Sequence, residues 1–277
     1  MNKKDGHSHT EFCPHGSGDD VELMIQKAIQ FGFDTYSITE HAPLPPTFQQ
    51  EYAGELTGLT EASMAMSDLP AYFAKCRQMQ AKYGAQIHIN VGFEVDFLPH
   101  HVDWTRDFLN AYGPQTTDNV LSVHFMQGTA DKFWCVDDTT GDFDKGLLAN
   151  AADGQVLYQQ YFKALQTAVL ADLGKYAPKR IGHITLIRKF QDYFKLPRTY
   201  DDATQAEIDR LLNLLHDQGR ELDYNAAGLY KEFCNETYPN LGIVRQAQAL
   251  GIPLVYGSDA HSIAEVGHGY HMVMDQL

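Results

Sequence analysis

DGHSHTEFCPHG, residues 5–16, places three histidines within nine residues, with a carboxylate and a thiol close by. The three are His7, His9 and His15. No helical period puts His7 and His9 on one face, so we do not expect this stretch to be a helix. It follows a short strand that we expect to end near Asp5. Motifs elsewhere in the sequence indicate which groups these rings face.

The composition favours one globular domain that acts on a small molecule. The chain has 277 residues, of which 44% are hydrophobic and 12% aromatic, so it can bury a full core. We expect a single α/β domain over residues 1–277. The chain carries 36 acidic and 21 basic side chains, a net charge of −15, and no basic run longer than a pair. A nucleic-acid partner is therefore not expected, and a small substrate is favoured.

The cysteines and the apolar runs indicate a soluble cytoplasmic protein. The four cysteines lie far apart without a C-x-x-C pair, and we interpret them as reduced thiols. The first ten residues have two lysines but no apolar segment after them. No apolar run approaches the roughly 18 residues that a membrane span needs. The sequence gives no indication of an oligomeric state.

Short β-branched apolar runs alternate with longer stretches of helical period, which is typical of βα units. After the strand near Asp5 we expect strands over 33–41, 86–97, 119–124, 180–187, 220–228 and 253–261. We expect helices over 19–32, 69–84, 153–174, 203–218 and 240–250. Seven such units predict a closed or nearly closed βα barrel.

Histidines and carboxylates lie at the carboxyl ends of nearly all these strands. In a βα barrel these ends open on one face, where active sites are built, so residues far apart in sequence should meet there. Imidazoles and carboxylates are ligands of divalent transition metals, and this set exceeds what one tetrahedral site uses. We therefore expect more than one metal ion. The residues are His7, His9, His41, Glu94, His124, His183, Asp259 and His261.

Single histidines carry little weight on their own, since a residue such as His183 is more often a hydrogen-bonded core residue than a ligand. The joint pattern is more specific, with H-x-H after the first strand and S-D-A-H after the last. Cys13 is either a soft ligand or a bystander, and one cysteine beside a proline favours the bystander. We assign no role to the remaining histidines, which are His88, His100, His101, His216, His268 and His271.

The ordered motifs resemble the polymerase and histidinol phosphatase (PHP) family over the whole chain. They are H-x-H-T near the N-terminus, then TEH, GFEVD, SVH, GHIT and GSDAH. The resemblance implies a distorted seven-stranded TIM-like barrel with three divalent metal ions at the carboxyl ends of the strands. It implies a first ion held by His7, His9, Glu94 and Asp259. A second would share Glu94 and add His124 and His183, and a third would take His15, His41 and His261.

Within the family, the stretches 5–20, 36–45 and 122–128 resemble the stand-alone histidinol-phosphate phosphatase branch. This implies a phosphomonoesterase that hydrolyses L-histidinol phosphate to L-histidinol and phosphate in histidine biosynthesis. The alternative within the family is a nucleotide phosphatase or exonuclease that uses the same trinuclear site. A non-enzymatic metal-binding module is a third hypothesis, but so few ligands for three ions leave positions open for water and substrate.

The implied site predicts a mechanism. Two ions about 3.5–4 Å apart, with Glu94 as their bridge, lower the pKa of a bridging water toward ~7 and give a hydroxide nucleophile. Ser17, before a helix N-terminus, and Arg188, after the fifth strand, are candidate phosphate contacts. Asp259 or a histidine such as His261 would protonate the leaving alkoxide. Mixed nitrogen and oxygen ligands suit zinc, iron and manganese alike.

Two long loops, 42–68 and 125–150, are expected to shape the specificity of this site. In the second, Phe133 and Trp134 beside two aspartates are candidates to accept an aminoalkyl imidazole, although such a charge run is usually a solvated face. The two aspartates are Asp137 and Asp138. Asn225, at the end of the strand that offers no ligand, either hydrogen-bonds within the site or caps the turn.

Overall fold

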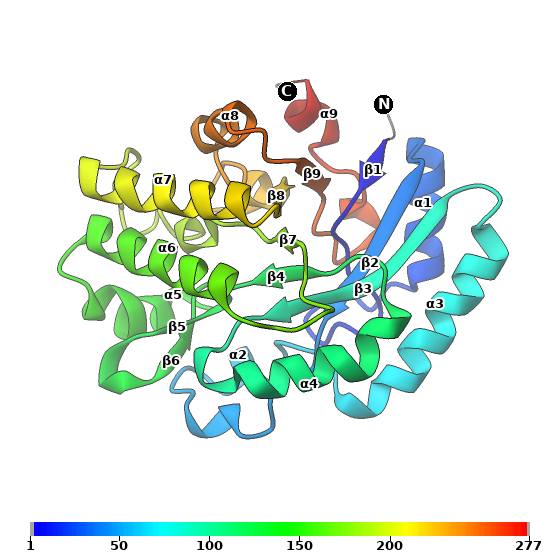
Figure 1. Ribbon diagram of the computed structural model, residues 1–277, viewed down its shortest axis with the longest axis horizontal. Helices are drawn as coiled ribbons and strands as arrows, with labels where there is room; N and C mark the ends of the chain where they lie inside the picture. The colour runs from blue at the N-terminus through cyan, green and yellow to red at the C-terminus, as the bar shows by residue number, and fades with distance from the viewer. Residues whose placement is uncertain (1–2, 276–277) are drawn as a thin grey trace.

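Seven short parallel strands form the centre of the molecule, one for each strand expected from the sequence. The structure is a computed structural model that describes residues 3–275. The strands follow one another around a single sheet in the order β1-β2-β3-β4-β7-β8-β9 (Figure 1). They are β1 (Lys4–Asp5), β2 (Thr35–His41), β3 (His88–Asp96), β4 (Val120–Ser122), β7 (Arg180–Ile181), β8 (Glu221–Asn225) and β9 (Leu254–Gly257).

The sheet nearly closes on itself, because β1 lies beside β9. The Gly6 amide donates to the Tyr256 carbonyl at 2.8 Å, and just beyond the strands the Asp259 amide donates to the His7 carbonyl at 2.8 Å. The His9 amide donates to the Ala260 carbonyl at 2.9 Å. The expected α/β barrel of seven strands is confirmed, with a seam between its first and last strands.

Helices cover the outside of the barrel, so strands such as β2 are buried along their whole length. Four helices begin at an Asp or Asn whose side chain accepts a backbone N–H, namely α1, α6, α7 and α8. The longer helices are α1 (Val21–Phe31), α3 (Leu69–Tyr83), α4 (Val102–Tyr112), α6 (Gly154–Leu170), α7 (Asp202–Asp217) and α8 (Leu241–Ala249). Shorter ones are α2 (Thr57–Thr60), α5 (Thr140–Asp142) and α9 (Tyr270–Met274).

The sequence-based expectation missed α4. Its sequence, VDWTRDFLNAY, is rich in β-branched and aromatic residues with modest helix propensity. Tertiary packing stabilises this helix instead, with the Phe108 ring centroid 5.2 Å from that of Phe93 on β3. The strand expected over 180–187 was too long. It ends at Ile181 and is followed by a 3₁₀ turn over Leu186–Arg188, so His183 lies just past the strand.

The two long loops pack against each other beside the carboxyl ends of the strands. The loop 125–150 contains an antiparallel hairpin that the sequence analysis did not predict, formed by β5 (Phe125–Gln127) and β6 (Phe133–Cys135). The loop 42–68 joins this hairpin through the Phe133 amide, which donates to the Glu51 carbonyl at 2.9 Å. Phe48 packs into a small apolar cluster with Phe125 and Phe133.

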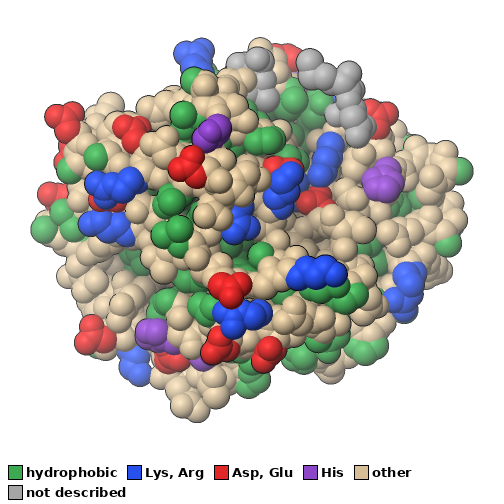
Figure 2. All heavy atoms as spheres, in the orientation of Figure 1, with side chains coloured by type: hydrophobic (Ala, Val, Ile, Leu, Met, Phe, Trp, Pro, Cys, Tyr) green, Lys and Arg blue, Asp and Glu red, His purple; other side chains and the backbone are tan. Residues whose placement is uncertain are grey.

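All four cysteines are buried free thiols. Basic and acidic side chains are interspersed on the face of the molecule drawn in Figure 2. Between residues 3 and 275, none of the helices combines the length and the apolar character that a membrane crossing requires.

Candidate metal centre

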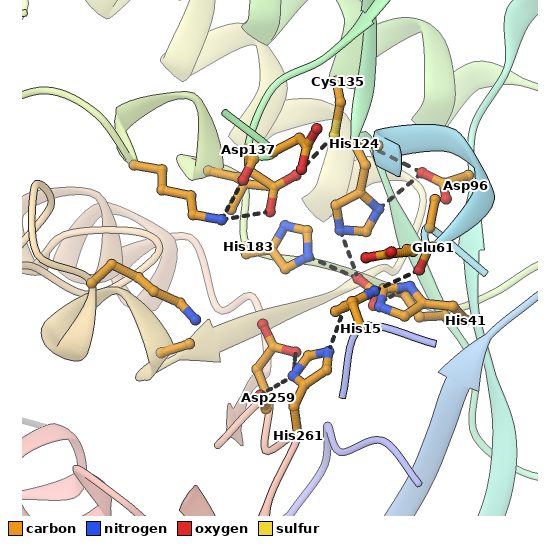
Figure 3. Close-up of a pocket in the computed structure, with 18 of the residues that line it drawn as sticks. His15, His41, Glu61, Asp96, His124, Cys135, Asp137, His183, Asp259 and His261 are labelled. Atoms are coloured by element: carbon orange, nitrogen blue, oxygen red, sulfur yellow. Dashed lines mark hydrogen bonds and ion pairs between the residues drawn. The ribbon is translucent and has the colours of Figure 1, made fainter. Parts of the chain in front are cut away.

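The residues expected to bind metals meet at the carboxyl end of the barrel. Figure 3 shows His15, His41, His124, His183, Asp259 and His261 gathered around one cavity. The ligand atoms of five of these residues, all but His15, fall with those of four further residues into three groups within which all atoms lie at most 4.8 Å apart. The groups are His7, His9, Glu94 and Asp259; then Glu94, His124 and His183; and then His9, Cys13, His41 and His261.

Two of these groups have the membership that the sequence predicted for the first two ions. The third differs, because it contains Cys13 and His9 and does not contain His15. His15 is nevertheless adjacent, with its Nε2 atom 3.0 Å from the Nε2 atom of His261. The side chain of Cys13 is therefore at the centre rather than away from it.

Glu94 lies between the first two groups and turns one carboxylate oxygen toward each. Its Oε1 atom is 2.8 Å from Nε2 of His183 and accepts a hydrogen bond from Ser122 at 2.6 Å. Its Oε2 atom is 3.2 Å from both Nε2 of His7 and Nδ1 of His41. This carboxylate is 1% exposed and can bridge two cations.

Three buried carboxylates contact the Nδ1 atoms of three histidines of the centre. The sequence analysis did not predict this role for them. Asp223 Oδ2 is 2.9 Å from Nδ1 of His7, and Glu40 Oε1 is 3.2 Å from Nδ1 of His9. Asp96 Oδ1 is 2.9 Å from Nδ1 of His124. A carboxylate partner favours the tautomer with its proton on Nδ1, which leaves Nε2 free to bind a metal.

A sequence signal for two of these carboxylates existed. Glu40 directly precedes His41, and Asp96 lies two residues after Glu94 on the same strand, so both sit where ligands were already expected. Asp223 gave no comparable signal because its strand carries no ligand.

Several buried nitrogen atoms of the centre lack a hydrogen-bond partner among the described residues. They are Nε2 of His7, both ring nitrogens of His41 and Nδ1 of His183. Buried polar atoms are almost always paired, so these orphans require an explanation. Imidazole nitrogens facing carboxylate oxygens form a donor set that divalent transition metals accept, and the residues fit such ions.

The carboxylates and imidazoles of the centre shift one another's pKa values. Burial works against ionisation of Glu94, but the neighbouring imidazoles, His7 foremost, hold the pKa of its carboxyl well below the usual range. Burial lowers the pKa of His124, but Asp96 and Glu94 outweigh this effect and raise it to about 10. His9 is similar, since its carboxylate partners overcome burial and raise its pKa to about 9.

Six of the nine residues in these groups line a cavity of about 410 Å³, and they are His41, Glu94, His124, His183, Asp259 and His261. Residues of the loop 42–68 and of the hairpin region line it, together with residues that follow β7, β8 and β9. Its carboxylates beyond the ligands include Glu61, Asp137 and Asp138, and its aromatic rings are Phe125 and Tyr238. Phe133 and Trp134, which were expected to accept the substrate's imidazole, are not part of this lining.

The structure places the three expected substrate contacts differently. Ser17 is exposed and lines the cavity. Arg188 does not, because it is 1% exposed and its Nε atom is 2.5 Å from Oε1 of Glu236. Asn225 is fully buried, and its side chain both hydrogen-bonds within the centre and accepts the Ala227 amide at 2.9 Å.

Two lysines that the sequence analysis did not select line the cavity. Lys189, next to Arg188, donates to the Asp137 backbone carbonyl, and its Nζ atom is 3.2 Å from Asp137 Oδ2. Lys231 lines the cavity and is exposed. In the 3₁₀ turn after β7, successive residues point about 120° apart, so Lys189 reaches the cavity while Arg188 packs between Tyr158 and Tyr200.

Comparison with known proteins identifies the family. The Histidinol-phosphatase of Bacillus subtilis (strain 168) is 36% identical over 276 residues, which is 100% of this chain and 100% of that protein. A Listeria monocytogenes protein solved as a candidate histidinol phosphatase has a TM-score of 0.95 and 45% identity, over 98% of this chain and 99% of that one.

A histidinol phosphate phosphatase from Lactococcus lactis subsp. lactis, solved in complex with Zn, L-histidinol and phosphate, shares the fold. It has a TM-score of 0.71 and 18% identity, over 99% of this chain and 94% of that one. The PHP-associated family matches residues 238–276, which contain Asp259 and His261. The PHP domain family matches residues 5–227, and the chain belongs to it.

Proposed function

We propose that this protein is a metal-dependent phosphomonoesterase that hydrolyses L-histidinol phosphate to L-histidinol and phosphate. The observation that carries the proposal is Glu94, whose two carboxylate oxygens face two different histidine groups on the floor of one cavity. Full-length similarity to the Bacillus subtilis Histidinol-phosphatase supports the substrate.

We propose three divalent ions in this centre, zinc, iron or manganese. The first two would be held by the groups that share Glu94, and the third by His15, His41 and His261, with Cys13 beside them. Divalent ions in such a site supply an activated water for attack on phosphorus and neutralise charge on the phosphoryl oxygens. Glu94 fixes the spacing of the first two groups.

The chain's own cations and hydroxyl bind the phosphate in this proposal. Lys189 takes the role expected of Arg188, because its ammonium group lines the cavity and the guanidinium does not. Lys231 and the Ser17 hydroxyl add a second charge and a donor. Either Asp259 or His261, both of which line the cavity, passes a proton from water to the leaving oxygen.

The substrate's ammonium and imidazole groups would bind to the acidic and aromatic part of the lining. Glu61 and Asp138 offer carboxylates, and Phe125 offers an apolar ring face. Asp137 is less available, since Lys189 already occupies its carboxylate. We further propose that the chain acts as one domain in histidine biosynthesis in the cytoplasm, where buried free thiols stay reduced.

The test combines metal analysis of the purified protein with initial rates on a panel of phosphate esters. We expect kcat/KM for histidinol phosphate to exceed that for a mononucleotide or an aryl phosphate by about 100-fold or more, since contacts to the amine and imidazole stabilise only its transition state. Single-stranded DNA should be a poor substrate for a chain of net charge −15. Comparable efficiency on nucleotides, or stepwise release of nucleotides from an oligomer, would reject the proposed substrate.

A further inference from the structure

Among the described strands of the barrel, β8 is the one that offers no group to the three ligand sets. It nevertheless sends two polar side chains, Asp223 and Asn225, into the centre. Both are fully buried. Burying a carboxylate and an amide is costly unless they interact with specific partners, so their contacts indicate why they are there.

Asp223 contacts a histidine of the first group directly. Its Oδ2 atom is 2.9 Å from Nδ1 of His7. The other ring nitrogen of His7, Nε2, has no hydrogen bond and lies 3.2 Å from Oε2 of Glu94. Asp223 therefore fixes both the tautomer and the direction of this ring.

Asn225 joins Asp223 to a second ligand of the same group. Its Nδ2 atom donates to Oδ2 of Asp223 and to Oδ2 of Asp259, each at 3.1 Å. Its Oδ1 atom accepts the Ala227 amide, which fixes the orientation of the side-chain amide. Asn225 thus links Asp223 on β8 to Asp259 after β9 and, through Asp223, to His7 after β1.

The neighbouring strand leaves room for this arrangement only because it carries a glycine. A Cβ atom at Gly257 on β9 would lie 2.4 Å from Oδ1 of Asp223 and 2.8 Å from Cβ of His7. The close approach of the β9 backbone holds the Asp223 carboxylate against the His7 ring. The contact between Asp223 and His7 therefore depends on β8, on β9 and on the segment after β1.

We propose that Asp223 and Asn225 are positioning residues that set the metal affinity of the first group, His7, His9, Glu94 and Asp259. This rests on the proposed metal centre but not on the identity of the substrate. A carboxylate behind a metal-bound imidazole raises the basicity of the ligand, and its loss typically lowers metal affinity about 10- to 100-fold.

The experiment measures zinc affinity of the metal-free full chain by competition with a chromophoric chelator. The variants are Asp223→Ala and Asp223→Asn, with Asp142→Asn as the matched control, since Asp142 is also buried but bonds the Glu55 amide away from the ligand groups. We expect Asp223→Ala to weaken the binding of one zinc equivalent about 10- to 100-fold. Asp223→Asn should lose less, because its amide oxygen still accepts from His7, and the control should match wild type.

Thermal unfolding of the metal-free variants separates positioning from a purely structural role. We expect Asp223→Ala to recover most of its turnover at excess zinc. A folded Asp223→Ala protein with wild-type zinc affinity would overturn the proposal, as would a loss of thermal stability without any change in affinity. If affinity depends on Asp223 but histidinol phosphate is not hydrolysed, the positioning role holds and the proposed substrate fails.

Discussion

At the scale of single residues, Glu94 is the group on which the centre depends most. Replacing it by Gln keeps its shape but removes the negative charge that both histidine groups face. We expect Glu94→Gln to lower kcat by about 100-fold or more, because a preorganised charge at the reacting centre is lost. Steady-state kinetics with metal analysis will measure this.

Glu207→Gln is the matched control for Glu94→Gln, since Glu207 is a buried glutamate on α7 that pairs with Arg210 outside the centre. Asp96 is unsuitable as a control because it holds His124. Similar losses at Glu94 and Glu207 would show that the effect on turnover is not specific to the proposed bridge.

Lys189 is the second residue whose role can be isolated. We expect Lys189→Met to raise the KM for the phosphate ester, and to weaken inhibition by inorganic phosphate, by about 10-fold or more, since a charge-assisted hydrogen bond contributes about 1.5–3 kcal/mol. Metal content should not change. Lys179→Met is the control, because Lys179 pairs with Glu221 on the surface and does not line the cavity. An unchanged KM in Lys189→Met would exclude Lys189 from phosphate binding.

At the scale of elements, β3 has to lie unusually close to the chain that leads into β4. A Cβ atom at Gly92 would lie 1.7 Å from the backbone carbonyl oxygen of Asp118, so no larger residue fits without moving the strand that carries Glu94. We expect Gly92→Ala to destabilise the fold by about 1–3 kcal/mol, and by more if the backbone cannot move. Thermal unfolding of the metal-free protein measures the change.

Gly242→Ala provides the comparison for Gly92→Ala. Gly242 lies in helix α8, where an added Cβ meets only the Asn240 side chain at 3.3 Å. The contact is far looser than the one at Gly92, so we expect this variant to change the free energy of unfolding much less than Gly92→Ala does. Equal destabilisation by both substitutions would contradict the close approach of β3.

At the scale of the whole molecule, metal ions should close the barrel. The seam between β1 and β9 includes the amides of Gly6, His9 and Asp259, and the first ligand group joins residues from both sides of it. An ion that binds only the folded state stabilises it by about 2.7 kcal/mol at 100 times its dissociation constant. We therefore expect a chelator to lower the melting temperature and abolish activity, and a divalent metal to restore both.

Hydrogen exchange would locate this effect. The amides of Gly6, His9 and Asp259 should exchange faster after chelation, whereas amides at the centre of β2 and β3 should change little. Uniform acceleration over the whole sheet, or no acceleration at the seam, would contradict a metal-closed barrel.

The sequence by itself predicted the seven-stranded barrel and most of the histidines and carboxylates that gather at its carboxyl end. Apolar periodicity is a local property that the sequence shows directly. The carboxyl ends of parallel strands in a barrel meet on one face, so the sequence alone predicts that His7, Glu94 and Asp259 lie close together. The sequence did not predict the helix α4, because packing and not its own helix propensity stabilises it.

Only the tertiary structure decided which atoms face one another. Three contacts depend on side-chain directions across separate strands and turns. Cys13 joins the third group, and Asp223 contacts His7. Lys189 lines the cavity, whereas Arg188 does not. Such directions change by about 120° with each residue of a 3₁₀ turn, and a buried partner more than 200 positions away leaves no local pattern. The sequence therefore specified the kind of centre, and packing specified its contacts.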